Sequence, residues 1–483
     1  MAVALYTSRV VLHVLGIDDY GIYSVVGGFV GMFSLISASL TASTQRFITF
    51  ELGKKSDGHS QEVFSAALTI HFLIAIVVLI LAESVGLWFL NEKMIIPVER
   101  LSAANWVFQF SLFTFIVNLI SVPYNSAIVA HEKMTAFAYI SLIEAFLRLV
   151  IVFVLTWLSF DKLVVYGFLM LIVAVIIRII YGFYCSRQFS ETKFIIVRDK
   201  AYYQQMLGFS GWNILGSSAG VLTNYGINVL MNLFFSVVVN AARGIASQVD
   251  SAVNQFVGNF TMAINPQIIK SYAAGDNSYM MRLVMRGSRY SYYLLLIMAM
   301  PLLLETEILL KIWLGTVPAA TIIFVRLTLI YSLCQSISNT LYTAMLATGK
   351  IRNYQIIVGG LALMAFPLAY MFYKVGFPPE FGYVATIITS IICLIARLYL
   401  LKEMVKLSIR AFFKDVLISI IIVTIIAFLI PIISRTILEP GVTRLFVVLG
   451  VSIASTILSI LLFGISSEER STLISIIKNK HGR

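Results

Sequence analysis

Apolar residues in this chain run in stretches of about 20, and polar residues collect in the short gaps between them. A helix of that length crosses the ~30 Å hydrocarbon core of a bilayer. Because hydrocarbon offers the backbone no hydrogen bonds, such stretches must be helices packed on one another. The pattern therefore predicts an all-α polytopic membrane protein with about 14 transmembrane helices. The predicted spans are residues 1–15, 21–44, 64–90, 104–128, 136–158, 163–184, 207–234, 240–265, 288–312, 320–345, 354–374, 381–400, 412–434 and 443–465.

Composition agrees with this pattern, since 59% of the 483 residues are apolar, 12% are charged and the net charge is +12. The basic residues favour alternate gaps, beginning with residues 45–63 and ending with the C-terminal tail. Basic residues accumulate on the cytoplasmic side of membrane proteins, so these gaps and the C-terminus are predicted to be cytoplasmic. The positive charge is thereby explained by topology, and we expect no nucleic-acid partner.

Weak internal similarity relates the two halves of the chain. Gln45 and Gly53 recur as Gln267 and Gly275, about 220 residues later. A repeat of this length predicts two related six-helix bundles. We expect an N-terminal lobe at residues 1–200, a C-terminal lobe at 201–405, and two appended helices with a cytoplasmic tail at 406–483. The same offset places the start of the first helix before residue 1, so the chain is expected to begin inside that helix, through a late start codon or a real truncation.

Catalytic signatures are absent from the sequence. No phosphate-binding glycine loop followed by Lys-Ser/Thr and no zinc-protease or nucleophile-elbow motif is present. The five histidines are scattered without the spacing of metal ligands. No loop is long enough for a soluble catalytic domain. We therefore expect a protein that is not an enzyme and uses no cofactor or metal.

Charged residues inside predicted spans need a reason, because each costs about 3 kcal/mol at bilayer depth. The basic residues in question are Arg9, Arg148, Arg178, Arg243 and Arg326. Glu144 lies four residues before Arg148 on one helical face, so Arg148 has two interpretations, a neutralised pair or a cavity residue. Arg178 and Arg326 lie near the ends of their spans, where they can reach the interface. Arg9 and Arg243 have no acid close by on the same helix, which favours a functional role.

Polar residues form stripes along spans seven and eight at helical spacing. On span seven these are Asn213, Ser217, Asn224, Asn228 and Asn232, and on span eight they are Asn240, Arg243, Ser247, Asp250, Asn254 and Asn265. Helix–helix hydrogen bonds account for some of them. So many amides and hydroxyls also suit a wet cavity for sugars, while guanidinium groups suit phosphate or diphosphate.

Four segments resemble the polysaccharide transporters that flip O-antigen and related lipid-linked oligosaccharides. They are TSRVVLHVLGIDDYGIYSVVGG at 7–28, TQRFITFELGK at 44–54, NAARGIASQV at 240–249 and NPQIIKSYAAGD at 265–276. The family shares the MOP superfamily with MATE multidrug exporters and the lipid II flippase. The resemblance implies two pseudo-symmetric six-helix lobes around a central cavity, in some members with two extra C-terminal helices.

The resemblance and the polar stripes together lead to one hypothesis: a flippase of the bacterial inner membrane for an undecaprenyl-diphosphate-linked oligosaccharide. Arg9, Arg148 and Arg243 are the expected diphosphate contacts, and Asn224, Asn228, Asn232, Asp250 and Asn254 the expected sugar contacts. Expected partners are the lipid-linked cargo, membrane lipids, a candidate coupling ion (H⁺ or Na⁺), and polysaccharide polymerase or ligase machinery. The alternative is an ion-coupled MATE-like multidrug exporter, which would use acids such as Asp250, Glu144 and Glu83.

Overall fold

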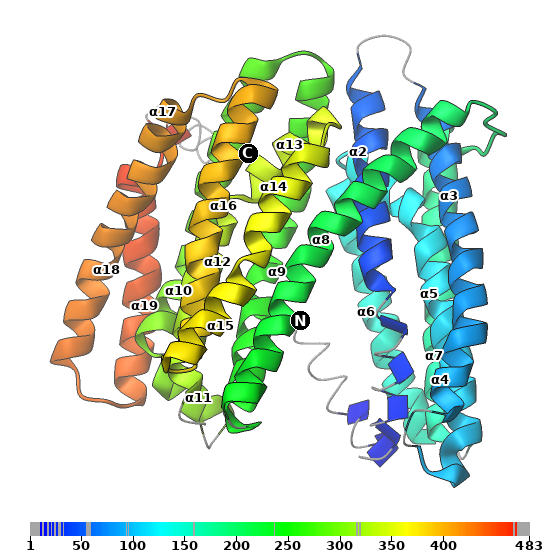
Figure 1. Cartoon of the computed structure of the whole chain (residues 1–483), viewed down its shortest axis with the longest axis horizontal. Coiled ribbons are helices and arrows are strands. Elements are labelled where there is room, and N and C mark those ends of the chain that lie inside the picture. The colour runs from blue at the N-terminus through cyan, green and yellow to red at the C-terminus, as the bar shows by residue number, and fades with distance from the viewer. Residues whose placement is uncertain are drawn as a thin grey trace, which may run out of the picture. The chain divides into compact units, whose positions relative to one another are not determined.

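The computed structural model of the chain is helical throughout the residues it describes, and no strand occurs among them (Figure 1). The described residues are 10–11, 14–16, 19–20, 22–23, 26–27, 30–31, 33–54, 59–92, 94, 96–157, 160–235, 237–314, 317, 320–466 and 469–470. The prediction of an all-α polytopic chain is confirmed. Most of the predicted first span lies outside the described residues, and so does Arg9.

The chain divides into two compact units, residues 1–214 and 215–483, and the division falls inside helix α8. Helices up to that point are α2 (Ser34–Gly53), α3 (Ser60–Leu81), η1 (Ala82–Gly86), α4 (Leu87–Glu92), η2 (Val98–Arg100), α5 (Leu101–Ala130), α6 (Met134–Trp157), α7 (Lys162–Gln188), η3 (Ser190–Thr192) and α8 (Lys200–Phe234). The later helices are α9 (Val237–Ala273), α10 (Asn277–Leu304), α11 (Thr306–Leu314), α12 (Thr321–Ser336), α13 (Asn339–Thr348), α14 (Arg352–Leu363), α15 (Ala365–Val375), α16 (Phe381–Val405), α17 (Ile409–Phe412), η4 (Phe413–Ile418), α18 (Ser419–Ile437), α19 (Val442–Ser459) and η5 (Ile460–Gly464). The predicted lobe limits at 200 and 405 stay a prediction.

Nine helical segments within the described residues are long and apolar enough to cross a membrane, and the bent pair α10–α11 brings the number to ten. Helices α2, α8 and α9 occupy the predicted spans at 21–44, 207–234 and 240–265 but do not meet the same test, because they carry many polar residues. Every predicted span from the second to the fourteenth thus has a helix in the structure.

In the first unit, helix α5 packs against α2, α3 and α7. Phe64, Phe108 and Leu119 are fully buried there. Ser39 and Ser43, one turn apart on α2, donate hydrogen bonds to the backbone carbonyls of Ser210 at 2.8 Å and Met206 at 3.2 Å. Small hydroxyl side chains allow this close approach of α2 to the first part of α8 and add polar contacts between the helices.

Asp161 begins helix α7 at the end of a loop and accepts hydrogen bonds from the backbone N–H groups of Leu163 and Val164. Arg100 donates to the same carboxylate at 2.6 Å and to Asp19 at 2.7 Å. Burial acts to raise the pKa of the Asp161 carboxyl, but the hydrogen bonds and the positive charge of Arg100 outweigh it, and the pKa lies below its ordinary value. The carboxylate is therefore held charged as both a helix cap and an ion-pair partner.

In the second unit, helix α10 packs against α9, α12 and α13, and also against the appended helices α18 and α19. Helix α10 approaches α13 closely at Gly287, where an added Cβ would lie 2.4 Å from Thr340 Cγ2. Next to it, the hydroxyls of Ser288 and Thr340 share a hydrogen bond of 2.8 Å. The absence of a side chain at Gly287 lets this buried polar contact form.

Two predicted spans are not single straight helices. The span predicted at 288–312 bends by 80° between α10 and α11, at Glu305. The span predicted at 354–374 is interrupted at Met364, between α14 and α15. Pro367 explains the second break, because its ring has no N–H to donate to the carbonyl of Leu363 and clashes with that carbonyl.

Glu305 also fixes the appended helices to α10. Its side chain is 1% exposed and accepts a hydrogen bond of 3.0 Å from Arg444 at the start of α19, while Arg435 of α18 lies 3.9 Å away. The Arg444 side chain is only 13% exposed. A buried carboxylate facing two guanidinium groups joins three helices at one point.

We predict that Glu305→Gln destabilises the protein by about 3 kcal/mol, because it leaves Arg444 buried without a compensating charge. The free energy of unfolding of the purified protein, measured by detergent titration, checks this. The double variant Glu305→Gln/Arg444→Met should recover most of the loss, since it removes both charges together.

Glu307→Gln is the matched control, because Glu307 lies two residues away, is exposed and, among the described residues, forms its ion pair with Lys311 of the same helix. It should unfold like the unaltered protein. Equal stability of the Glu305→Gln and Glu307→Gln variants would show that the buried pair does not hold the appended helices.

Candidate functional site

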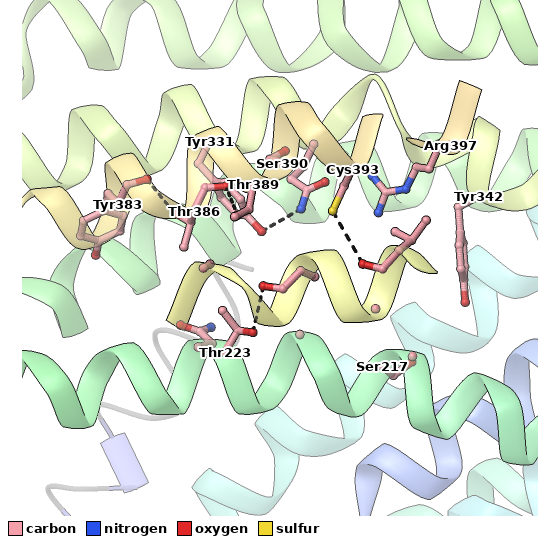
Figure 2. Close-up of a pocket in the computed structure, with 18 of the residues that line it drawn as sticks. Ser217, Thr223, Tyr331, Tyr342, Tyr383, Thr386, Thr389, Ser390, Cys393 and Arg397 are labelled. Carbon is pink, nitrogen blue, oxygen red and sulfur yellow. Dashed lines mark hydrogen bonds between the residues drawn. The ribbon is translucent and has the colours of Figure 1, made fainter. Parts of the chain in front are cut away.

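A cavity of about 360 Å³ lies within the second unit, among helices α8, α9, α12, α13, α14, α15 and α16 (Figure 2). This volume is in the range of small-molecule sites. Its wall is rich in hydroxyl, phenol and amide groups. The polar lining residues are Ser217, Thr223, Asn224, Arg243, Ser247, Asp250, Thr328, Tyr331, Gln335, Tyr342, Tyr354, Gln355, Tyr383, Thr386, Thr389, Ser390 and Arg397.

One face of α16 supplies the longest row of lining side chains. The row runs through Tyr383, Thr386, Thr389, Ser390, Cys393 and Arg397 (Figure 2). The members lie three or four residues apart, apart from the adjacent Thr389 and Ser390, so they share one side of the helix. The cavity therefore extends along about four turns of α16.

The break between α14 and α15 forms part of the opposite wall, where Ala362 and Ala365 line the cavity. The Thr223 hydroxyl donates to the backbone carbonyl of Ala362 at 3.2 Å (Figure 2). This carbonyl lies at the end of α14, where the helical hydrogen bonds are interrupted. A side chain of α8 thus adds a hydrogen bond to a backbone carbonyl beside the break.

Arg243 of α9 points its guanidinium group across the cavity wall. It donates to the side-chain oxygen of Asn224 at 2.5 Å and to the backbone carbonyl of Asn224 at 3.1 Å. Its guanidinium carbon lies 5.4 Å from the centre of the Tyr383 ring. No ion pair joins Arg243 to a carboxylate in the described part of the chain. The positive charge is therefore oriented but not neutralised.

Asp250 is the acidic residue among the lining side chains. Its carboxylate accepts hydrogen bonds from Asn254 at 2.8 Å and from the Ser332 hydroxyl. Asn254 also donates to Ser332 at 3.2 Å, which closes a three-residue network between α9 and α12. Asn254 is not itself a lining residue. Asn254 acts on the cavity indirectly, because its hydrogen bond holds the Asp250 carboxylate in place.

The structure brings together three of the predicted site residues in one cavity: Arg243, Asn224 and Asp250. Asn228 is exposed on α8 and is not among the lining residues. Asn232 belongs to α8, but its side chain lies outside the described part of the structure. Arg148 belongs to the first unit, where it pairs with Glu144 at 2.5 Å. The roles assigned to these residues stay predictions.

Several lining residues were not anticipated from the sequence. Tyr331, Tyr354, Gln355 and Tyr383 stand in otherwise apolar helices, and each in isolation resembles a packing residue. Arg397 lies near the end of the span predicted at 381–400, where a basic residue is ordinarily a topological signal. Helix α16 continues to Val405, which places Arg397 two turns inside it. The hydroxyl residues of α16, three or four residues apart, were the feature of the sequence that could have predicted this wall of the cavity.

A smaller cavity of about 200 Å³ lies in the first unit. Its described lining residues include Gly27, Gly31, Gly167, Phe115 and Met170 together with the polar residues Tyr23, Ser111, Thr114 and Asn118, and none of these described residues is charged. The described part of its wall therefore offers an anion hydrogen bonds but no positive charge. The second-unit cavity is the better candidate for a binding site.

Comparisons with known proteins agree with the fold. The family profile described as "Polysaccharide biosynthesis protein" matches residues 3–271. No curated protein sequence matches the chain. Among solved structures, an outward-facing multidrug resistance MATE family transporter of the MOP superfamily is 11% identical, with a TM-score of 0.73, over 84% of this chain and 92% of that one.

Two further structures show the same fold. A MOP superfamily transporter from Pyrococcus furiosus, described as having a binding pocket of reverse polarity, is 12% identical with a TM-score of 0.70, over 85% of this chain and 92% of that one. The MATE transporter ClbM in complex with Rb⁺ is 14% identical with a TM-score of 0.60, over 84% of this chain and 94% of that one. Since the family match covers more than half of the chain, the protein belongs to the polysaccharide biosynthesis protein family and has the fold of MOP superfamily transporters.

Proposed function

We propose that this protein carries an undecaprenyl-diphosphate-linked oligosaccharide across the bacterial inner membrane for the synthesis of O-antigen or another surface polysaccharide. The family description supports a role in polysaccharide biosynthesis. The fold supports transport, not chemical conversion. The chemistry of the second-unit cavity supports the identity of the cargo.

The observation that carries the proposal is the combination of neutral polar groups and unneutralised positive charge in that cavity. Hydroxyls from Thr386, Thr389 and Ser390 and the amide of Gln335 offer hydrogen bonds to sugar hydroxyls. The phenols of Tyr331 and Tyr383 add both hydrogen bonds and flat apolar faces for sugar rings. A glycan needs this mixture, because its ring carries hydroxyls at the edge and C–H groups on its faces.

Arg243 is the proposed contact for the diphosphate. Its planar guanidinium group can form two parallel hydrogen bonds with phosphate oxygens. Asn224 and Tyr383 hold that group in place before cargo arrives, which lowers the ordering cost of binding. Arg9 and Arg148 in the first unit are proposed as further contacts along the diphosphate path. Asn228 and Asn232 are proposed for the sugar path on α8.

Transport is proposed to follow alternating access of two helical lobes, residues 1–200 and 201–405, with the appended helices at 406–483. The glycan and diphosphate would travel in polar surroundings while the prenyl tail stays in the bilayer. The distribution of basic residues supports a cytoplasmic C-terminus. Polymerase or ligase machinery is the proposed consumer of the delivered cargo.

The alternative is a MATE-like multidrug exporter driven by H⁺ or Na⁺. Asp250 supports it, because this carboxylate lines the cavity and has no ion-pair partner among the described residues. The balance of charge opposes it. Two guanidinium groups, Arg243 and Arg397, line the described cavity against one carboxylate. An excess of positive charge disfavours the cationic compounds that such exporters carry.

We predict that Arg243→Ala lowers the export of glycan at least about tenfold, because it removes charge-assisted hydrogen bonds worth about 1.5–3 kcal/mol to the diphosphate. The assay is a host strain lacking the gene and complemented with each variant. Surface glycan is measured together with lipid-linked oligosaccharide on each face of the inner membrane. Accumulation on the cytoplasmic face is the expected result.

Arg282→Ala is the matched control, since Arg282 also lies over a tyrosine ring, 5.6 Å from Tyr279, but is exposed and lies outside the cavity. It should export glycan normally. Unchanged surface glycan in the Arg243→Ala strain, at normal abundance in the membrane, would contradict the assignment of Arg243. A strain that never forms lipid-linked glycan would point to a role in synthesis.

A second prediction separates the two functions. Asp250→Asn keeps the shape of the network with Asn254 and Ser332 but removes the negative charge. If the cargo is anionic, surface glycan should be retained within about threefold of normal, since the lost charge repelled the cargo. If the protein is a cation-coupled exporter, the variant should lose efflux of cationic dyes, with no effect on glycan.

A further inference from the structure

The cavity has a second positive charge at the far end of the α16 row. Tyr383, beside Arg243, and Arg397 lie 14 residues apart on α16, which corresponds to about 21 Å along the helix axis. Both face the cavity, and hydroxyl residues fill the row between them (Figure 2). Positive charge therefore lies at both ends of an elongated and otherwise mostly neutral polar wall.

Arg397 is held firmly by one contact. Its Nε donates a hydrogen bond of 2.9 Å to the phenol oxygen of Tyr354, a residue of α14 that is 1% exposed. Rings of Tyr342 and Tyr354 lie against each other, with centroids 6.3 Å apart, and both line the cavity. The guanidinium group is thus fixed on the wall by a buried phenol.

The rest of the guanidinium group has unused hydrogen-bonding capacity. The Nη1 atom of Arg397 is buried and has no hydrogen-bond partner among the described residues. No ion pair with a carboxylate is formed in the same part of the structure. Buried donors of charged groups are rarely left unsatisfied, because the lost hydration is not replaced. An oxyanion bound in the cavity beside Arg397 would supply the missing counter-charge.

We propose that Arg397 is a second oxyanion-binding residue of the cavity and that Tyr354 positions it. The inference rests on the proposed transport function and adds to it a requirement on the cargo. Tyr383, which lies beside Arg243, and Arg397 are about 21 Å apart along α16, so we infer that one diphosphate contacts only one of the two arginines at a time. The second site therefore takes either the carboxylate of an acidic sugar, bound at the same time as the diphosphate, or the diphosphate itself at another stage of passage.

Helices α8 and α14 approach each other closely beside Tyr354. Gly216 of α8 faces Gln355 of α14, and an added Cβ at Gly216 would lie 1.8 Å from the Gln355 side-chain oxygen. The missing side chain at Gly216 permits this close approach, and both residues line the cavity.

Binding by the purified full-length protein tests the proposal with three probes: inorganic pyrophosphate, a neutral oligosaccharide and an oligosaccharide of the same length that contains glucuronic acid. Titration calorimetry on the unaltered protein and on Arg397→Ala, Arg397→Lys, Tyr354→Phe and Arg410→Ala measures each affinity. Arg410 is exposed on α17 and is not a lining residue, so its removal is the charge-matched control.

Arg397→Ala should weaken binding of at least one anionic probe by about 10- to 100-fold, the loss expected for hydrogen bonds to a charged group, and leave the neutral probe unchanged. A loss confined to the glucuronate probe identifies an acidic sugar as the ligand, and a loss confined to pyrophosphate identifies the diphosphate. Arg397→Lys should keep part of the affinity. Tyr354→Phe should weaken the same probe by a smaller factor, because it releases the guanidinium group without removing it.

Retained binding of the neutral probe shows that a variant is folded. If Arg397→Ala does not fold, the proposal is tested with Arg397→Lys and Tyr354→Phe. Wild-type affinity of both variants for both anionic probes would then overturn the proposal. Equal anion affinities in Arg397→Ala and Arg410→Ala overturn it as well, while leaving the transport of glycan intact. Failure of the unaltered protein to bind any of the three probes overturns this proposal and the proposed function together.

Discussion

In the hydrocarbon core of a bilayer, the protein itself must supply every hydrogen bond that its backbone needs. The helices of this chain meet that demand internally except at a few breaks, and the break at Met364 is the one around which the cavity forms. Pro367 removes a donor and displaces a carbonyl there, and the Thr223 hydroxyl of α8 donates to the neighbouring carbonyl of Ala362. The interrupted helix and a hydroxyl of the neighbouring α8 thus meet at one point of the polar wall.

The same constraint explains where charge is tolerated. Glu305 is buried with Arg444, and Glu469 pairs with Arg286 at 2.7 Å and Arg289 at 2.9 Å. Both carboxylates lie near ends of helix α10 or of the appended pair, and both join those elements. The pKa of the Glu469 carboxyl lies below its ordinary value. Burial alone would raise it, but the hydrogen bond from the Ser466 backbone N–H and the charges of the two arginines outweigh that effect. Neutralised charge fixes the appended helices, whereas Arg243 and Arg397, without carboxylate partners in the described structure, face the cavity.

The sequence was sufficient for the fold because membrane spans are long and the signal of each is strong. It also located Arg243, Asn224 and Asp250, since a polar stripe in an apolar helix has few structural explanations. It did not distinguish Asn254, which supports Asp250, from residues that line the cavity, because both share the same helical spacing. Tyr331, Tyr354 and Tyr383 escaped notice because an isolated tyrosine in a span resembles a packing residue. Arg397 escaped because it lies near the end of the span predicted at 381–400, where a charge is ordinarily a topological signal, whereas α16 continues to Val405.

All described lining residues of the large cavity fall between Gly216 and Arg397, inside a single compact unit. If that unit moves as a rigid body, its contacts with cargo are the same before and after the movement. A ligand with equal affinity for two states shifts no population between them, however tightly it binds. Such a site would work as an unbiased exchanger, loading and releasing in both directions with the same affinity. Net flow would then be set by the cargo concentration on each side, and the enzymes that consume the delivered glycan would supply the direction of transport.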